Sequence, residues 1–483
     1  MEIFDLIFSH FQPGVDPTLW HQLSRVNHNW YKAAIPRLYH QFEYNGDYSQ
    51  RKRLWLFLRT LIEAPRLAAF VQTVDLLHSL KFTGARSYLL AALMCEEHDS
   101  TIKHAIQVTG LSSLGPEDIL DTLRRDDRRP LVAMVLACLP NLDTLYLNVS
   151  DSDPYLQLII SQSVTFSDGS ASRQRFRAPA FQRLRRLFTA PDDQEDCRGD
   201  ALQITKNQPL IYLPELRELV IISAKINPDI FAWTTIPNKT AMSLFLSNLT
   251  LVLHESSDLK GFFLLLESIP RLTSLSVCFK GIASSAWVPW GRKALWDRLQ
   301  RFQYRLRQLD LSGIAFDRSQ PQPDLTKYCP PLRQFTKLDS LNIEPLALFG
   351  NCARHNAPHQ LAEHLPQALG QLTIYDGGLL GGYMSHRFIP QFDEQLESIA
   401  KTPHPPREIT VETRRIDDVL KMLDMACRKR KITLNLSGRR NLNNGGMFSA
   451  FACSSRRHRR PFNPHMGGVL RDIARTGVNS LTS

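Results

Sequence analysis

The stretch Leu139-Pro140-Asn141-Leu142-Asp143-Thr144-Leu145-Tyr146-Leu147 contains the phrase from which the fold can be predicted. Its core reads apolar-x-x-apolar-x-apolar, with leucine at positions 142, 145 and 147. The same phrase begins again at Leu184, Leu216, Leu246, Leu272, Leu306, Leu338 and Leu369, and an early copy begins at Val71. Most steps between copies are 26 to 34 residues long. A period in this range is typical of a solenoid.

Each phrase predicts one strand, because its last four residues alternate between apolar and polar. The intervals between phrases have room for a helix. Asp258–Ser268 is one such helix, which Ile269-Pro270 should end, since a residue before proline avoids helical backbone angles. A single strand-plus-helix unit cannot bury its apolar face alone, so neighbouring units must stack.

The repeated phrase resembles the leucine-rich repeat in an irregular form. One match could arise by chance, but eight copies in loose register do not. The resemblance implies an α/β fold, a leucine-rich-repeat-like solenoid in which a curved parallel sheet carries outer helices. Polar residues between the apolar positions should point outward from the strands. We expect target-binding residues among them, at Tyr146, Arg217, Glu218, Arg307, Asp310 and Asp339.

Composition places the chain among ordinary globular proteins, with 483 residues, 43% hydrophobic and 22% charged. No hydrophobic run approaches the roughly 18 residues of a membrane span, and no signal peptide is expected. Eight cysteines are scattered without a Cys-x-x-Cys pair. This pattern favours reduced thiols inside a cell, in the cytoplasm and/or the nucleus.

The net charge of +11 is concentrated at the C-terminus. From Met425 onward there are twelve Lys or Arg residues and one acidic residue, Asp472. The basic character therefore belongs to a tail, and nucleic-acid binding along the repeats is not expected. Within the tail, Arg428–Lys431 and Arg456–Arg460 resemble nuclear-import or nucleic-acid-binding patches; the alternative is a solvated basic segment.

Three short helices are predicted at the N-terminus. Residues 1–11 form an apolar face, which Gln12-Pro13-Gly14 ends. Asp16-Pro17 should begin a second helix, in which Leu19, Leu23, Val26 and Trp30 follow helical spacing. A third helix is predicted over Tyr31–Tyr39, with a kink at Pro36.

This segment resembles an F-box, through Glu2-Ile3, residues 6–11, Leu19 to Trp30 and Leu38-Tyr39. Residues 58–71 also resemble the segment that comes after the box in fungal F-box proteins. The Leu-Pro that opens the family's box is missing. The resemblance implies that the helices bind a Skp-type adaptor, with contacts from Ile3, Ile7, Phe8, Leu23, Val26 and Trp30. The alternative is that these helices cap the end of the solenoid.

The sequence therefore divides into four predicted regions. Residues 1–45 are F-box-like helices, and residues 46–80 are a linker helix with the first repeat strand. Residues 81–437 are irregular leucine-rich repeats with a helical insertion near 80–139, whereas residues 161–180 and 191–200 should be surface loops. Residues 438–483 are a basic, largely disordered tail.

The box and the repeats together imply the substrate-recognition subunit of an SCF-type (cullin–RING) E3 ubiquitin ligase. The expected partners are the Skp-type adaptor with the cullin–RING ligase core and an unidentified protein substrate, with no membrane. The alternatives are a leucine-rich-repeat scaffold without a ubiquitin role, or a nuclear or nucleic-acid-associated protein that acts through its tail.

No catalytic, cofactor-binding or metal-binding residues are expected, and the chain is not predicted to be an enzyme. Cys352, His355 and His359 have a spacing that could hold zinc, but a second cysteine pair in register is missing. The glycine pairs at 377–378 and 381–382 lack the lysine and helix of a phosphate-binding loop.

Overall fold

The computed structural model describes residues 17–44, 51–76, 96–125, 127–149, 153–167, 180–191, 202–203, 208–226, 245–254, 257–279, 291–312, 332–343, 361–375, 389–413 and 421–438. The chain divides into two compact units. One comprises Met1–Ile222 and Trp233–Leu246, and the other comprises Ser223–Ala232 and Ser247–Ser483. Each unit combines a parallel sheet with helices, so the predicted α/β class is confirmed.

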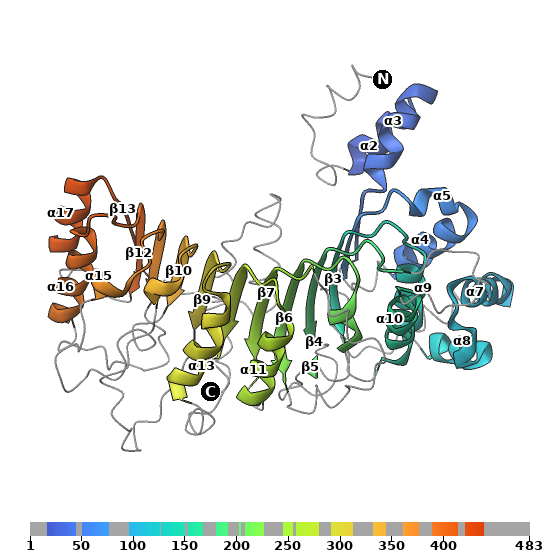
Figure 1. Ribbon diagram of the computed structural model, residues 1–483. Helices are drawn as coiled ribbons and strands as arrows, with labels where there is room; N and C mark the ends of the chain where they lie inside the picture. The colour runs from blue at the N-terminus through green and yellow to red at the C-terminus, as the bar shows by residue number, and fades with distance from the viewer. Residues whose placement is uncertain are drawn as a thin grey trace, which may run out of the picture. The chain divides into compact units, whose positions relative to one another are not determined.

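The first unit contains a sheet whose strands lie side by side in chain order (Figure 1). Its members are β1 (Gln41–Glu43), β2 (Thr73–Leu76), β3 (Thr144–Val149), β4 (Arg186–Pro191) and the first part of β6 (Glu218–Lys225). Adjacent strands are parallel, and the phrases align position for position, as in Leu145 opposite Leu187 and Leu187 opposite Leu219. The short strand β5 (Leu202–Gln203) pairs with β6.

The second unit repeats this arrangement with β7 (Asn248–Leu253), β8 (Ser274–Cys278), β9 (Gln308–Ser312), β10 (Ser340–Ile343), β11 (Gln371–Tyr375), β12 (Glu408–Thr413) and β13 (Thr433–Gly438). These strands are also parallel and in register, with Leu275 opposite Leu309 and Leu309 opposite Leu341.

Helices precede the first strand and lie in many of the intervals between strands. The first unit contains α2 (Pro17–Leu23), α3 (His28–Leu38), α4 (Arg51–Glu63), α5 (Pro65–Ala68), α7 (Glu96–Thr109), η2 (Leu111–Leu114), α8 (Pro116–Arg124), α9 (Arg129–Ala137), α10 (Pro154–Ser167) and η3 (Gln208–Tyr212). The second contains α11 (Leu259–Ser268), α13 (Gly291–Leu299), η5 (Gln300–Phe302), η7 (Leu332–Gln334), α15 (Leu361–His364), α16 (Ile389–Ala400) and α17 (Lys421–Arg430). In the described part of the chain, no helix combines the length and the apolar character needed to cross a membrane.

The phrase places its strand and its core residues as predicted. Every strand from β2 to β4 and from β6 to β11 begins two residues after the first apolar residue of its phrase. The apolar residues of the phrase are buried, as Leu272, Leu275 and Val277 illustrate with at most 1% of their surface exposed. The helix predicted before Ile269-Pro270 is α11, and the Asp258 side chain caps it by accepting a hydrogen bond from Lys260 N at 2.7 Å.

A backbone hydrogen-bond ladder fixes the register at the start of the strands. In the first unit, single carbonyl oxygens of His40, Gln72, Asp143 and Arg185 each accept two successive N–H groups from the next repeat, at 2.9 to 3.1 Å. In the second unit, those of Ser247, Thr273, Arg307, Asp339 and Gly370 do the same, at 2.7 to 3.2 Å. The two N–H groups and the carbonyl oxygen at each step of the ladder belong to the backbone, so these bonds themselves do not require a particular side chain.

Three local predictions are wrong. The residues from Leu19 to Trp30 do not form one helix, because α2 ends at Leu23 and α3 begins at His28 after a turn. Residues 41–43 within the segment expected to be helical form β1, and Phe42 lies opposite Val74. Residues 161–167, expected to be loop, continue α10. The region expected to be a helical insertion contains α7, α8 and α9.

Candidate functional site

The turn between α2 and α3 holds the described part of the predicted adaptor site. Asn27 ends this turn, and its Oδ1 accepts hydrogen bonds from Asn29 N at 3.0 Å and Trp30 N at 3.1 Å. An asparagine cap satisfies amide groups that have no partner inside the helix. Asn27 therefore begins a new helix and divides the apolar pattern that the sequence presents as one.

Trp20 is the centre of a small core between α2 and α3. It is 1% exposed and lies with Ala33 and Ala34, while Leu23, Trp30 and Leu38 pack against this cluster with part of their surface exposed. The guanidinium of Arg37 lies 5.8 Å from the centre of the Trp20 ring and donates a hydrogen bond to Ala33 O at 3.0 Å. These contacts hold the two helices as a pair.

Val26 lies in the turn itself and is 60% exposed. The structure thus brings together three of the predicted adaptor-binding residues, with Val26 open to solvent and Leu23 and Trp30 half-buried beside the Trp20 core. Tyr31, which sequence reasoning did not select, is also exposed. Ile3, Ile7 and Phe8 lie outside the described residues.

One of the predicted target-binding residues of the first unit, Tyr146, forms an aromatic stack. The Tyr146 ring stacks on the Phe188 ring of the neighbouring strand, with centroids 4.4 Å apart and planes 9° apart. Burial and the negative charge of Asp75 raise the pKa of the Tyr146 hydroxyl above its usual range. Burial also raises the pKa of Glu218. Tyr146 and Glu218 are half-buried, whereas Arg217 is exposed.

The face that carries these residues is more buried than the alternation of the sequence predicts. Phe188 and Val220 point to the face opposite the leucines, yet each is only 1% exposed. In the second unit, Asp310 is 6% exposed, while Arg307 and Asp339 are exposed. The three exposed predicted residues, Arg217, Arg307 and Asp339, all stand one residue before a strand, in the row that the backbone ladder holds.

A second row of exposed side chains on the same edge was missed by sequence reasoning. Arg271, Arg305 and Lys337 stand three residues before β8, β9 and β10, and each comes directly before the first leucine of its phrase. Their shared position relative to the phrase is the signal that could have identified them.

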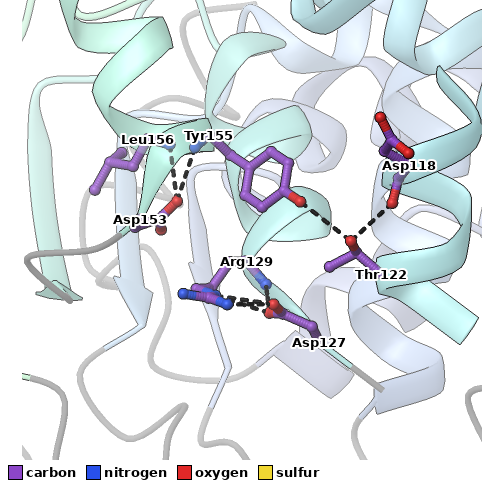
Figure 2. A network of polar contacts seen from close by, with 7 residues as sticks. All are labelled: Asp118, Thr122, Asp127, Arg129, Asp153, Tyr155 and Leu156. Atoms are coloured by element: carbon purple, nitrogen blue, oxygen red, sulfur yellow. Dashed lines mark hydrogen bonds and ion pairs between the residues drawn. The ribbon is translucent and has the colours of Figure 1, made fainter. Parts of the chain in front are cut away.

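Polar contacts gather at α8, α9 and α10 (Figure 2). Asp153 precedes α10, and its Oδ1 accepts hydrogen bonds from Tyr155 N at 3.0 Å and Leu156 N at 3.1 Å. The Tyr155 hydroxyl donates to Thr122 Oγ1 at 3.3 Å, which ties α10 to α8. Burial raises the pKa of Asp153, and its hydrogen bonds oppose the shift. This carboxylate therefore serves as a helix cap at a cost in desolvation.

Figure 2 also shows an ion pair at the start of α9. Arg129 donates to the Asp127 carboxylate at 2.6 Å from one terminal nitrogen and at 2.9 Å from Nε. Among the residues that the structure describes, no group of three His, Cys, Asp or Glu side chains could hold a metal ion. Cys352, His355 and His359 lie outside those residues.

The functional conclusion rests on the residues and their geometry, because comparison with known proteins found no match. No protein-family model matches this chain, and no curated protein matches it.

Proposed function

We propose that this protein is the substrate-recognition subunit of an SCF-type (cullin–RING) ubiquitin ligase. The α2–α3 turn binds a Skp-type adaptor, and the repeats bind a protein target. The chain makes and breaks no bond itself. By tethering the target beside the ligase core, it raises the effective concentration of the target's lysines near the charged ubiquitin carrier.

The observation that carries this proposal is the exposed Val26 beside the partly exposed Leu23 and Trp30. An aliphatic side chain in a turn, flanked by a tryptophan already fixed by packing, can enter an apolar pocket of a partner at little cost in conformational entropy. The F-box resemblance of the surrounding sequence supplies the identity of that partner. The exposed polar residues on the edge of the repeats suit recognition of a protein target.

The direct test is co-purification of the full chain with a Skp-type adaptor. Val26→Asp places a charge in the proposed interface without disturbing the Trp20 core, and it should weaken adaptor binding about tenfold or more. Met425→Asp in α17, where the methionine is 57% exposed, is the matched control and should leave adaptor binding unchanged. Circular dichroism of both variants checks that the fold is intact.

Two results would contradict the proposal. If the parent chain does not bind the adaptor, the ligase assignment fails, and a repeat scaffold without a ubiquitin role becomes the better description. If the parent binds and Val26→Asp binds equally well, the α2–α3 turn is not the adaptor site.

A further inference from the structure

Three cationic side chains occupy equivalent positions on three consecutive strands of the second unit. Arg271, Arg305 and Lys337 stand three residues before β8, β9 and β10, and all three are exposed. The strands are parallel and in register. The backbone ladder joins the residues that lie two positions after each cation, which are Thr273, Arg307 and Asp339. We call Arg271, Arg305 and Lys337 the cationic row. Because adjacent strands are about 4.8 Å apart, the row spans roughly 10 Å along one edge.

The surroundings of the cationic row strengthen its positive charge. The three turn segments 270–273, 300–307 and 332–339 contain six Lys or Arg residues and one acidic residue, Asp339. Arg307 and Arg333 are exposed beside the row. Among the described residues, Arg271, Arg307 and Lys337 form no ion pair, whereas Arg305 donates a hydrogen bond to Pro270 O at 2.7 Å. Like charges stacked at this spacing repel one another, and an anionic ligand would relieve that repulsion.

Tyr304 adds an aromatic surface to the edge. It precedes Arg305 in the turn before β9 and is 63% exposed, the highest exposure among the large apolar and aromatic side chains described. Tyrosine and arginine are among the side chains that most often dominate the binding energy of protein interfaces. The edge therefore combines a positive field with a suitable anchor for a polypeptide.

We propose that the cationic row binds an acidic stretch of a partner polypeptide. In an extended chain, side chains on one face repeat about every 6.6 to 6.8 Å, so a row of about 10 Å fits two carboxylates. A nucleic acid of useful affinity needs contacts to more phosphates than this short row can reach. This inference rests on the proposal that the repeats hold a protein target, and it does not depend on the adaptor.

The test uses the full chain and a fluorescein-labelled peptide of eight glutamates, with fluorescence anisotropy at physiological salt. The double variant Arg271→Glu/Lys337→Glu changes two exposed residues that make no described ion pair, and it should weaken peptide binding at least tenfold. Arg456→Glu/Arg459→Glu in the basic C-terminal segment changes the net charge by the same amount and should weaken binding less than threefold. A peptide of eight glutamines should not bind.

Three outcomes would overturn the inference. Equal loss in both double variants would mean that affinity follows net charge alone. Equal binding of the glutamine peptide would mean that carboxylates are not recognised. Tighter binding of a labelled single-stranded oligonucleotide, lost in Arg271→Glu/Lys337→Glu, would make the row a nucleic-acid site. Adaptor co-purification with the same double variant separates this test from the proposed function, because a defect in the row should leave adaptor binding intact.

Discussion

Replacing Leu309 with alanine tests whether the repeated phrase holds the sheet together. Leu309 is 1% exposed in β9 and lies between Leu275 of β8 and Leu341 of β10, which are buried to the same extent. The substitution removes three carbon atoms, which at about 0.8 kcal/mol each corresponds to roughly 2.4 kcal/mol of lost burial. The cavity left between the two neighbouring leucines adds to this, so we expect a total loss of about 3 to 4 kcal/mol.

The assay is urea unfolding of the full chain followed by circular dichroism, with hydrogen exchange of residues 308–312 as a local measure. Tyr304→Ala is the control, because it removes a larger side chain from the same repeat but one that is mainly exposed. Its effect should stay below about 0.5 kcal/mol. If Leu309→Ala costs less than about 1 kcal/mol, or no more than Tyr304→Ala, the apolar positions of the phrase do not form the core as argued.

Two further substitutions test individual helix caps. Asn27→Ala removes the acceptor for Asn29 N and Trp30 N and should destabilise α3 by about 1 kcal/mol, measured by thermal unfolding, whereas Asn27→Ser should restore most of the loss. Burial raises the pKa of Asp153 in the folded protein above its value in the unfolded chain. The protonated side chain therefore stabilises the fold fully below the unfolded-state pKa, and this stabilisation is lost as the pH rises through the folded-state pKa. Asp153→Asn, which keeps a capping oxygen, should therefore have a higher melting temperature than the parent near neutral pH. The difference in melting temperature should narrow as the pH falls toward about 4. If Asp118→Asn, which changes an exposed carboxylate, raises the melting temperature equally, burial of Asp153 is not the cause.

The strands were predictable because their signal is local and repeated. Each copy of the phrase carries its own apolar triplet, so the strand prediction does not depend on any single copy. The strand β1 was missed because Gln41-Phe42-Glu43 lacks the leucine triplet. Only its pairing with β2, a contact distant in sequence, makes it a strand.

The candidate site was less predictable, because alternation reports which face a side chain points to but not whether that face is covered. Asp310 and Val220 occupy polar-face positions by sequence, and both are buried. The division between α2 and α3 was missed for a related reason. Leu23, Val26 and Trp30 keep helical spacing across a break that depends on a single cap, Asn27.

The backbone ladder has a consequence for how the protein can change over evolutionary time. The carbonyl groups that fix the register belong to residues as different as His40, Asp143, Ser247, Arg307 and Gly370, so the ladder bonds themselves do not require one type of side chain at this position. Substitutions at exposed positions of this row such as Arg307 should be nearly neutral for folding, whereas a side chain at Gly370 would press against the Asp339 carboxylate. Descendants of this chain can therefore acquire new binding preferences by single replacements along this edge, without first accumulating compensating changes in the interior.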